Sequence, residues 1–192
     1  MMAQDLFTRF QERLSASGGE CRLVADLAEA TQVIAAHPSL AEKEIVVPPD
    51  FSTRSPWSAI LSMLRDQGIR IREAGRPAEV ADAPAGLSNA ELAVAETGSV
   101  LIAENSLEAR VVGMLTLTHF VLVRASDLVP MLDEVGARLQ QITKAGPDQR
   151  HYVSLITGPS RTADIERMLT IGVQGPKTLC VLIVQDKEAK QL

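Results

Sequence analysis

The hydrophobic positions along the chain alternate between helical spacings and short apolar runs. Residues 5–17 carry apolar side chains three and four positions apart, which predicts an amphipathic helix ending at Gly18-Gly19. Ile45-Val46-Val47 is a β-branched run followed by two prolines, and it predicts a buried strand. The same two patterns recur along the rest of the chain. We therefore expect helices and strands in alternation.

The remaining elements follow from the same reasoning. Residues 74–87, rich in Ala, Pro and Gly, predict a surface loop, and Glu96-Thr97-Gly98 predicts a turn between two strands. Further helices are expected at 27–37, 57–67, 107–115, 127–142 and 162–169, and further strands at 22–25, 69–71, 92–95, 99–103, 120–123, 152–156 and 179–184.

Strands separated by helices predict an α/β fold, a single domain with a parallel-rich sheet covered by helices. The apolar strand runs fit such a sheet, whose strands are buried on both faces. Neither an internal repeat nor a second domain is recognisable, so we expect residues 1–192 to form one domain that opens with a helix within residues 1–18.

Composition narrows the classes of function. The formal net charge of -5 offers no basic excess for phosphates, which argues against nucleic-acid binding. The apolar stretch 111–123 falls short of the roughly 20 residues that cross a bilayer. Two cysteines and three histidines stand at no ligand spacing, so we expect no metal, iron–sulfur or other cofactor. We expect a soluble, cytoplasmic protein with buried thiols and no membrane segment.

The first segment with candidate chemistry is 93–100. Glu96 stands at the end of an apolar strand and is followed by a turn glycine, so its carboxylate could lie over a crevice as nucleophile or base. The alternative is a plain hairpin with a solvated Glu96, in which Thr97 and Gly98 serve turn geometry.

The second segment is 156–166, where a strand runs into a Gly-Pro turn. Ser160 and Thr162 stand where a helix is expected to begin, with Arg161 beside them, which predicts an anion site at a helix N-terminus. The alternative is capping alone, with Arg161 paired to Asp164 or Glu166 on the surface.

Three other features complete the candidates. Gly172 and Gly175 indicate a tight turn before the last strand. His119 stands inside an apolar run, where a hydrogen-bonded core histidine is the usual finding, and Arg110 lies in the preceding helix.

Together these segments resemble one family, the lactate utilization protein C or LUD domain family. Its members share, in this order, the motifs Ala95-Glu96-Thr97-Gly98, Arg110, His119, Thr157-Gly158-Pro159-Ser160-Arg161-Thr162-Ala163-Asp164-Ile165-Glu166 and Gly172-Val173-Gln174-Gly175-Pro176. The resemblance is specific over residues 87–184, the motif region.

The resemblance implies a fold similar to phosphosugar isomerases and CoA transferases (NagB/RpiA-like). It also implies a role in converting L-lactate to pyruvate together with iron–sulfur partner proteins, which would carry the redox centres. The catalytic candidates are then Glu96 and His119. The candidates for binding a substrate or anion are Thr97, Gly98, Arg110, Gly158, Ser160, Arg161, Thr162 and Asp164. We expect six of them to converge on one crevice at the sheet edge, outside the carboxyl ends of the strands: Glu96, Arg110, His119, Ser160, Arg161 and Asp164.

This chain departs from the family at two positions. Gln174 stands where the family usually has histidine, which puts an acid/base role of that turn in doubt. Thr116 replaces a proline before His119. The alternative function is an acyl-transfer, CoA-transfer or isomerase enzyme that acts on a small organic anion and uses Glu96.

Overall fold

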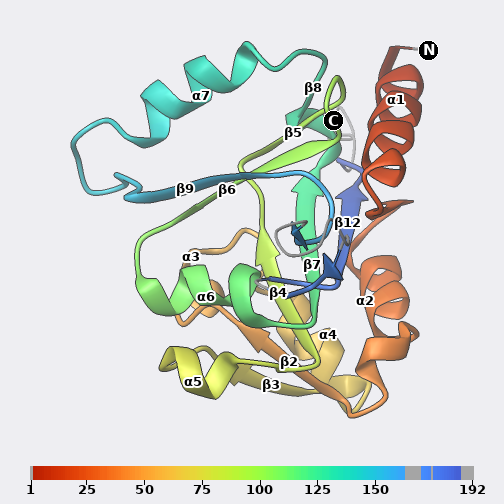
Figure 1. Ribbon diagram of the computed structural model, residues 1–192, viewed down its shortest axis with the longest axis vertical. Coiled ribbons are helices and arrows are strands. Elements are labelled where there is room, and N and C mark those ends of the chain that lie inside the picture. Colours follow the sequence, from red (N-terminus) through yellow and green to blue (C-terminus); the bar gives the residue numbers. More distant parts are fainter. Residues whose placement is uncertain (1, 163–169, 174, 187–192) are drawn as a thin grey trace, which may run out of the picture.

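A six-stranded sheet in the order β1-β12-β7-β4-β2-β3 runs through the molecule, and all its neighbouring strands are parallel. The computed structural model describes residues 2–162, 170–173 and 175–186. Figure 1 shows the parallel strands through the centre, with helices on both sides. The predicted α/β fold with a helix-covered, parallel-rich sheet is confirmed.

The helices are α1 (Met2–Ala16), α2 (Leu27–Ala35), α3 (Phe51–Arg54), α4 (Ile60–Asp66), α5 (Pro77–Val80), α6 (Leu107–Leu115) and α7 (Glu134–Ile142), with short 3-10 turns η1 (Pro38–Leu40) and η2 (Ala125–Asp127). The strands are β1 (Glu20–Val24), β2 (Glu44–Val47), β3 (Arg70–Glu73), β4 (Ala85–Asn89), β5 (Leu92–Val94), β6 (Ser99–Glu104), β7 (Thr118–Arg124), β8 (Leu128–Val129), β9 (Tyr152–Ile156), β10 (Arg161–Thr162), β11 (Thr170–Ile171) and β12 (Thr178–Val184).

Two cores lie on opposite faces of the parallel sheet. Alternate residues of β7, such as Phe120 and Leu122, pack against α2, α3 and α4. Their neighbours Val121 and Val123 pack against α1 and the inner face of a second sheet. Because side chains alternate across a strand, the fully apolar run of β7 fills both cores at once.

The second sheet has four strands in the order β8-β5-β6-β9. The hairpin of β5 and β6 is antiparallel, as is the pair of β6 and β9. Helix α7 covers its outer face through Val135 and Ile142 (Figure 1). This sheet and the parallel sheet together frame the clefts described below.

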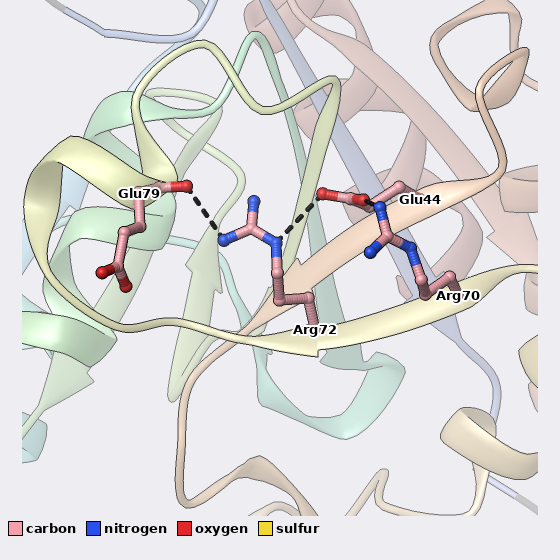
Figure 2. A network of polar contacts seen from close by, with 4 residues as sticks. All are labelled: Glu44, Arg70, Arg72 and Glu79. Atoms are coloured by element: carbon pink, nitrogen blue, oxygen red, sulfur yellow. Dashed lines mark hydrogen bonds and ion pairs between the residues drawn. The ribbon is translucent and has the colours of Figure 1, made fainter.

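Side-chain bonds mark the helix starts and tie down the edge of the sheet. Asp26 and Ser106 accept hydrogen bonds from the first turns of α2 and α6 and act as N-caps. At the outer strand β3, the carboxylate of Glu44 pairs with Arg70 and with Arg72, whose Nε lies 3.0 Å away. Arg72 also donates to the carbonyl of Glu79 at 2.9 Å (Figure 2). The network joins β2, β3 and α5.

Two expected elements outside the site motifs are wrong. The expected loop 74–87 contains α5 and the start of β4, because Ala85 and Gly86 serve close packing: a Cβ on Gly86 would lie 2.8 Å from Thr116 Oγ1. The expected helix 127–142 begins only at Glu134. Before it, β8 pairs with β5, and Pro130, which lacks a backbone N–H, follows that strand.

Candidate functional site

Nine residues of the motifs named above line one cleft, here called the motif cleft. It has a volume of about 440 Å³. Its walls are Arg110, Gly113, Met114, His119, Ser154, Leu155, Ile156, Thr157, Gly158, Pro159, Ser160, Arg161, Gly175, Pro176 and Leu179. The structure thus brings together five of the predicted site residues, from α6, β7 and the segment after β9.

The motif cleft lies at an unexpected end of the sheet. His119 is the second residue of β7 and Leu179 the second residue of β12, and the two are register partners. The cleft therefore opens at the amino ends of these strands. The expectation that these residues meet outside the carboxyl ends is wrong, because the segment after β9 returns to the opposite end of the sheet.

His119 is the most deeply placed polar residue of the cleft. Its side chain is 1% exposed, and its Nε2 lies 2.6 Å from the hydroxyl of Ser88. Its Nδ1 is buried and has no hydrogen-bond partner in the described part of the chain. Burial lowers the pKa of His119 to about 4, so the ring is neutral near pH 7. If Ser88 donates to Nε2, Nδ1 carries a hydrogen with no acceptor.

The two arginines of the cleft are exposed at its rim. The guanidinium of Arg110 lies over the ring of Tyr152, 5.4 Å from its centroid. Arg161 belongs to β10 and lies near Gly18, the second residue after the end of α1. Both leave N–H donors facing solvent, where a small anion could be held.

Glu96 lies apart from the walls of the motif cleft. Its carboxylate accepts a hydrogen bond of 2.9 Å from the backbone N–H of Leu132. Thr97, by contrast, is linked to the cleft by hydroxyl groups: its Oγ1 is 2.7 Å from Ser99 Oγ, which is 2.5 Å from Thr157 Oγ1. The turn that carries Glu96 is thus coupled to the cleft through Thr157.

The helix expected to begin at Thr162 is not found there. Arg161 and Thr162 form β10, which pairs antiparallel with β11 at Thr170 and Ile171. The backbone of Ser160 bonds to Gly172 and Pro176, at 2.9 Å each, so the motif that begins at Thr157 and the motif that begins at Gly172 contact each other. Arg161 and Thr162 therefore lie in a short antiparallel strand pair and not at the expected helix N-terminus. Asp164, Gln174 and the rest of the expected helix lie outside the described residues.

A second cleft, here called the polar cleft, was missed by the sequence reasoning. It lies at the carboxyl ends of β2, β4 and β7 and has a volume of about 300 Å³. Its walls are Pro48, Asp50, Phe51, Ser55, Pro56, Trp57, Asn89, Ala90, Glu91, Ala103, Glu104, Arg124, Asp127, Arg138 and Arg150. Seven of these residues carry a charge when ionised, and they come from segments far apart in the sequence.

Glu104 is the buried residue among the seven ionisable residues of the polar cleft. It ends β6 and is only 9% exposed. Burial, the largest cause, and the negative charges of Asp50 and Glu91 raise the pKa of its carboxyl, Arg150 lowers it, and the result is a pKa of about 7. Glu104 also lines a small interior cavity together with Ser88, Arg110 and His119. It therefore lies between the two clefts.

A sequence signal for Glu104 exists. It ends an apolar strand, as Glu96 was expected to do, and a charged residue at that position is an unusual use of charge. Arg138 and Arg150 lie on a helix and in a loop, and nothing in their sequence neighbourhood marks them.

The described residues also bear on membrane insertion and metal binding. None of the helices in the described residues has the length and apolar character needed to cross a bilayer. Within the same residues, no group of three or more His, Cys, Asp and Glu side chains is placed to hold a metal ion. Cys21 and Cys180 are buried free thiols, as expected from their apolar surroundings.

Comparison with curated proteins finds relatives called lactate utilization protein C. The one from Halalkalibacterium halodurans is 30% identical over 121 residues, which is 63% of this chain and 50% of the relative. The one from Bacillus velezensis is 27% identical over 151 residues, 74% of this chain and 63% of the relative. Lactate utilization protein C 1 from Bacillus mycoides is 32% identical over 53% of this chain and 44% of the relative. The chain thus matches about half the length of the first of these relatives.

Among solved structures, a DUF162 family protein from Deinococcus radiodurans has a similar fold. The TM-score is 0.65 at 19% identity, covering 95% of this chain and 98% of the other. The sequence model of the LUD domain matches residues 7–184, which include both clefts. The chain therefore belongs to the LUD domain family.

Proposed function

We propose that this protein is a component of a lactate utilization system and that its motif cleft binds a small carboxylate. The observation that carries the proposal is the Nδ1 of His119, which has no partner among the described residues and is buried at the wall of a cleft with two arginines at its rim. The proposed role in lactate utilization is supported by the relatives called lactate utilization protein C.

The chemistry of the cleft suits a carboxylate such as lactate or pyruvate. Arg110 and Arg161 offer forked donors for the two oxygens, and a neutral His119 with a hydrogen on Nδ1 can donate to a third oxygen. Because burial keeps the His119 ring neutral near pH 7, it would donate a hydrogen bond and not a full positive charge.

The oxidation of lactate would take place with partner proteins. Conversion of lactate to pyruvate removes two electrons and two protons, which an acceptor must take up. We propose that iron–sulfur proteins of the same system hold that acceptor, and that this chain holds no redox cofactor. The purified chain is then expected to be colourless, without iron, flavin or metal in stoichiometric amount.

The alternative, an acyl-transfer or isomerase activity of Glu96, requires the Glu96 side chain to move. The Glu96 carboxylate would have to leave its hydrogen bond with the N–H of Leu132 to reach a substrate. No contact among the described residues brings it to the wall of the motif cleft, so the carboxylate-binding function is the better supported of the two.

The proposal is tested first by binding. Arg161→Ala should weaken the binding of L-lactate or pyruvate, measured by calorimetry, by about tenfold or more, because a charged hydrogen bond is lost. The midpoint of thermal unfolding should change little, since Arg161 is exposed. Arg76→Ala is the matched control, because Arg76 is exposed and pairs only with Glu79 among the described residues. Lost stability with unchanged affinity would make Arg161 a structural residue.

The role in the pathway is tested in cells. A deletion strain should grow poorly with L-lactate as carbon source and normally with pyruvate, and the wild-type gene should restore growth. A pull-down from native cells should recover iron–sulfur proteins, and lactate oxidation by the recovered complex should require this chain. Normal growth of the deletion strain on L-lactate would exclude the proposed pathway.

A further inference from the structure

We propose that the polar cleft is a second ligand site, for a small organic anion that carries hydroxyl groups, and that Glu104 takes up a proton when the anion binds. The motif cleft lies at the amino ends of β7 and β12, whereas the polar cleft lies at the carboxyl ends of β2, β4 and β7. The two sites are thus separate, and the proposal does not depend on the motif cleft.

The location and size of the polar cleft suit a small molecule. In open α/β sheets, ligands collect outside the carboxyl ends of the parallel strands, where loops from several strands meet. Asp50 follows β2, Glu91 follows β4, and Arg124 ends β7. A volume of about 300 Å³ is at the lower end of the range for ligand pockets and fits an anion of a few carbon atoms.

Three arginines give the cleft its affinity for an anion. Arg150 lies 3.9 Å from Glu91, and Arg138 lies 3.6 Å from Asp127. Both distances are too long for direct hydrogen bonds. Arg138 also donates to the carbonyl of Glu91 at 3.0 Å and to Gln141 Oε1 at 3.2 Å, which leaves three of its five N–H groups for a ligand. Arg124 lies over the ring of Trp57, 5.7 Å from its centroid, which fixes it at the wall.

The carboxylates of the cleft decide what else the ligand must carry. Asp50, Glu91 and Asp127 accept hydrogen bonds but, when ionised, cannot donate them. A bare anion would be attracted by the arginines and repelled by these carboxylates. A ligand with hydroxyl groups beside its charge can donate to these carboxylates while its anionic end contacts the arginines. This combination predicts a hydroxycarboxylate.

Glu104 is the group whose protonation responds to the ligand. From the cleft it faces Asp50, Glu91 and Arg150, and Arg124, Asp127 and Arg138 complete the charged wall.

On the other side of Glu104 lies the small cavity that it shares with Arg110, His119 and Tyr152. Burial and Asp50 already leave the pKa of Glu104 at about 7. A further negative charge within the cleft would favour the protonated carboxyl, so anion binding and proton uptake are linked.

The chain supplies its own reporter of the polar cleft. Trp57 is the only tryptophan and forms part of this wall. Titration of the full chain with L-lactate or D-glycerate should change its fluorescence with a saturable response. Propionate, which lacks a hydroxyl group, should bind about tenfold more weakly or worse. Equal binding of propionate and lactate would contradict the requirement for a hydroxyl group.

The proposed proton uptake by Glu104 is tested by measuring affinity at different pH values. With a pKa near 7, the protonated fraction of Glu104 falls about tenfold between pH 6 and pH 8, and affinity should fall by up to the same factor. Glu104→Gln should bind equally well at both pH values, whereas His151→Gln, the control for an exposed neighbouring histidine, should keep the fall. In addition, calorimetry of the unmodified chain in two buffers of different ionisation enthalpy should show uptake of a fraction of a proton at pH 7.5. Absence of that uptake would overturn the proposed role of Glu104.

Two arginine variants separate this site from the motif cleft. Arg150→Gln should weaken the Trp57 response about tenfold or more, and Arg161→Ala should leave it unchanged. If Arg161→Ala abolishes the response and Arg150→Gln does not, the ligand sits in the motif cleft, and the polar-cleft proposal is wrong while the proposed function stands. No response to either hydroxy acid overturns the second site, whatever the growth phenotype of the deletion strain.

Discussion

Gly158 and Ser17 lie so close that a Cβ on Gly158 would be 2.5 Å from the carbonyl oxygen of Ser17. Gly98, which ends the motif Ala95-Glu96-Thr97-Gly98, makes a similar approach: a Cβ there would lie 2.4 Å from the backbone nitrogen of Leu14. Both glycines have positive φ, of +71° and +69°. The glycines of these two family motifs thus pack closely against the C-terminal end of α1 and the residue that follows it.

This contact predicts that Gly158→Ala is strongly destabilising. Alanine would have to adopt the left-handed region and displace the backbone at Ser17, costing about 2–4 kcal/mol of unfolding free energy. Chemical denaturation measures the change. Gly136→Ala is the control, because Gly136 lies in α7 with nothing within 4 Å of its Cβ position, and it should be neutral or slightly stabilising. Equal effects of the two variants would contradict the close contact.

The buried Glu104 predicts that stability falls as pH rises. Its pKa is raised from 4.5 to about 7 in the folded protein, so the folded state binds the proton more tightly than the unfolded state. The contribution is fully present below about pH 4.5 and is lost as pH rises through 7, amounting to at most about 3 kcal/mol.

The Glu104→Gln variant removes this dependence. Relative to the unmodified protein, it should become more stable by an increasing margin between pH 5 and pH 8, as measured by denaturant titrations across that range. A constant difference in unfolding free energy over the range would show that the Glu104 pKa is not raised in the folded state.

His119 predicts the opposite dependence at acid pH. Its pKa falls from 6.5 to about 4 on folding, so the unfolded state binds the proton more tightly. The stability associated with the neutral ring is complete above about pH 6.5 and is lost as pH falls toward 4, again by up to about 3 kcal/mol.

His119→Gln should flatten the fall in unfolding free energy between pH 6.5 and pH 4. Ser88→Ala is a useful companion, because it removes the 2.6 Å contact with Nε2 but keeps the titrating ring. It should lower stability at pH 7 by about 1 kcal/mol and leave the acid dependence in place. A steep acid dependence in His119→Gln would assign the effect to other groups.

Much of the fold follows from local sequence pattern. Leu107–Leu115 and Tyr152–Ile156 have the predicted bounds, because an N-cap serine and a β-branched or aromatic run determine them locally. Small residues commonly mark turns, so the sequence predicts a loop at Ala85 and Gly86. In the structure they allow β4 to pack against α6. That use depends on a tertiary contact and has no local signature.

The candidate site was predictable only where its residues share a motif. Ser160 and Arg161 are adjacent in sequence and both line the motif cleft. Glu104, Arg138 and Arg150 meet only because β6, α7 and the segment before β9 fold over the ends of the parallel strands. The spacing of these three residues along the chain does not indicate that they lie close together. Only their burial and charge in the folded structure do.

The ion-pair network at the edge strand β3 gives a last prediction: replacing Arg70 and replacing Arg72 should lower stability by different amounts. Both pair with Glu44, whose side chain is 12% exposed. The Arg72 side chain is 29% exposed and also bonds to the carbonyl of Glu79, whereas the Arg70 side chain is 73% exposed. Because water screens exposed ion pairs, Arg70→Ala should cost less than about 0.5 kcal/mol of unfolding free energy.

Arg72→Ala should cost about 1–2 kcal/mol, because it removes two hydrogen bonds and leaves a mostly buried Glu44 with only its exposed partner. Glu44→Gln should cost a similar amount, since both arginines then lose their charged acceptor. Urea titrations give the unfolding free energies without adding salt, and repeating them at high salt should reduce the effect of Arg72→Ala only in part, because screening acts least on buried pairs. If Arg70→Ala proves as costly as Arg72→Ala, burial does not determine the strength of this network.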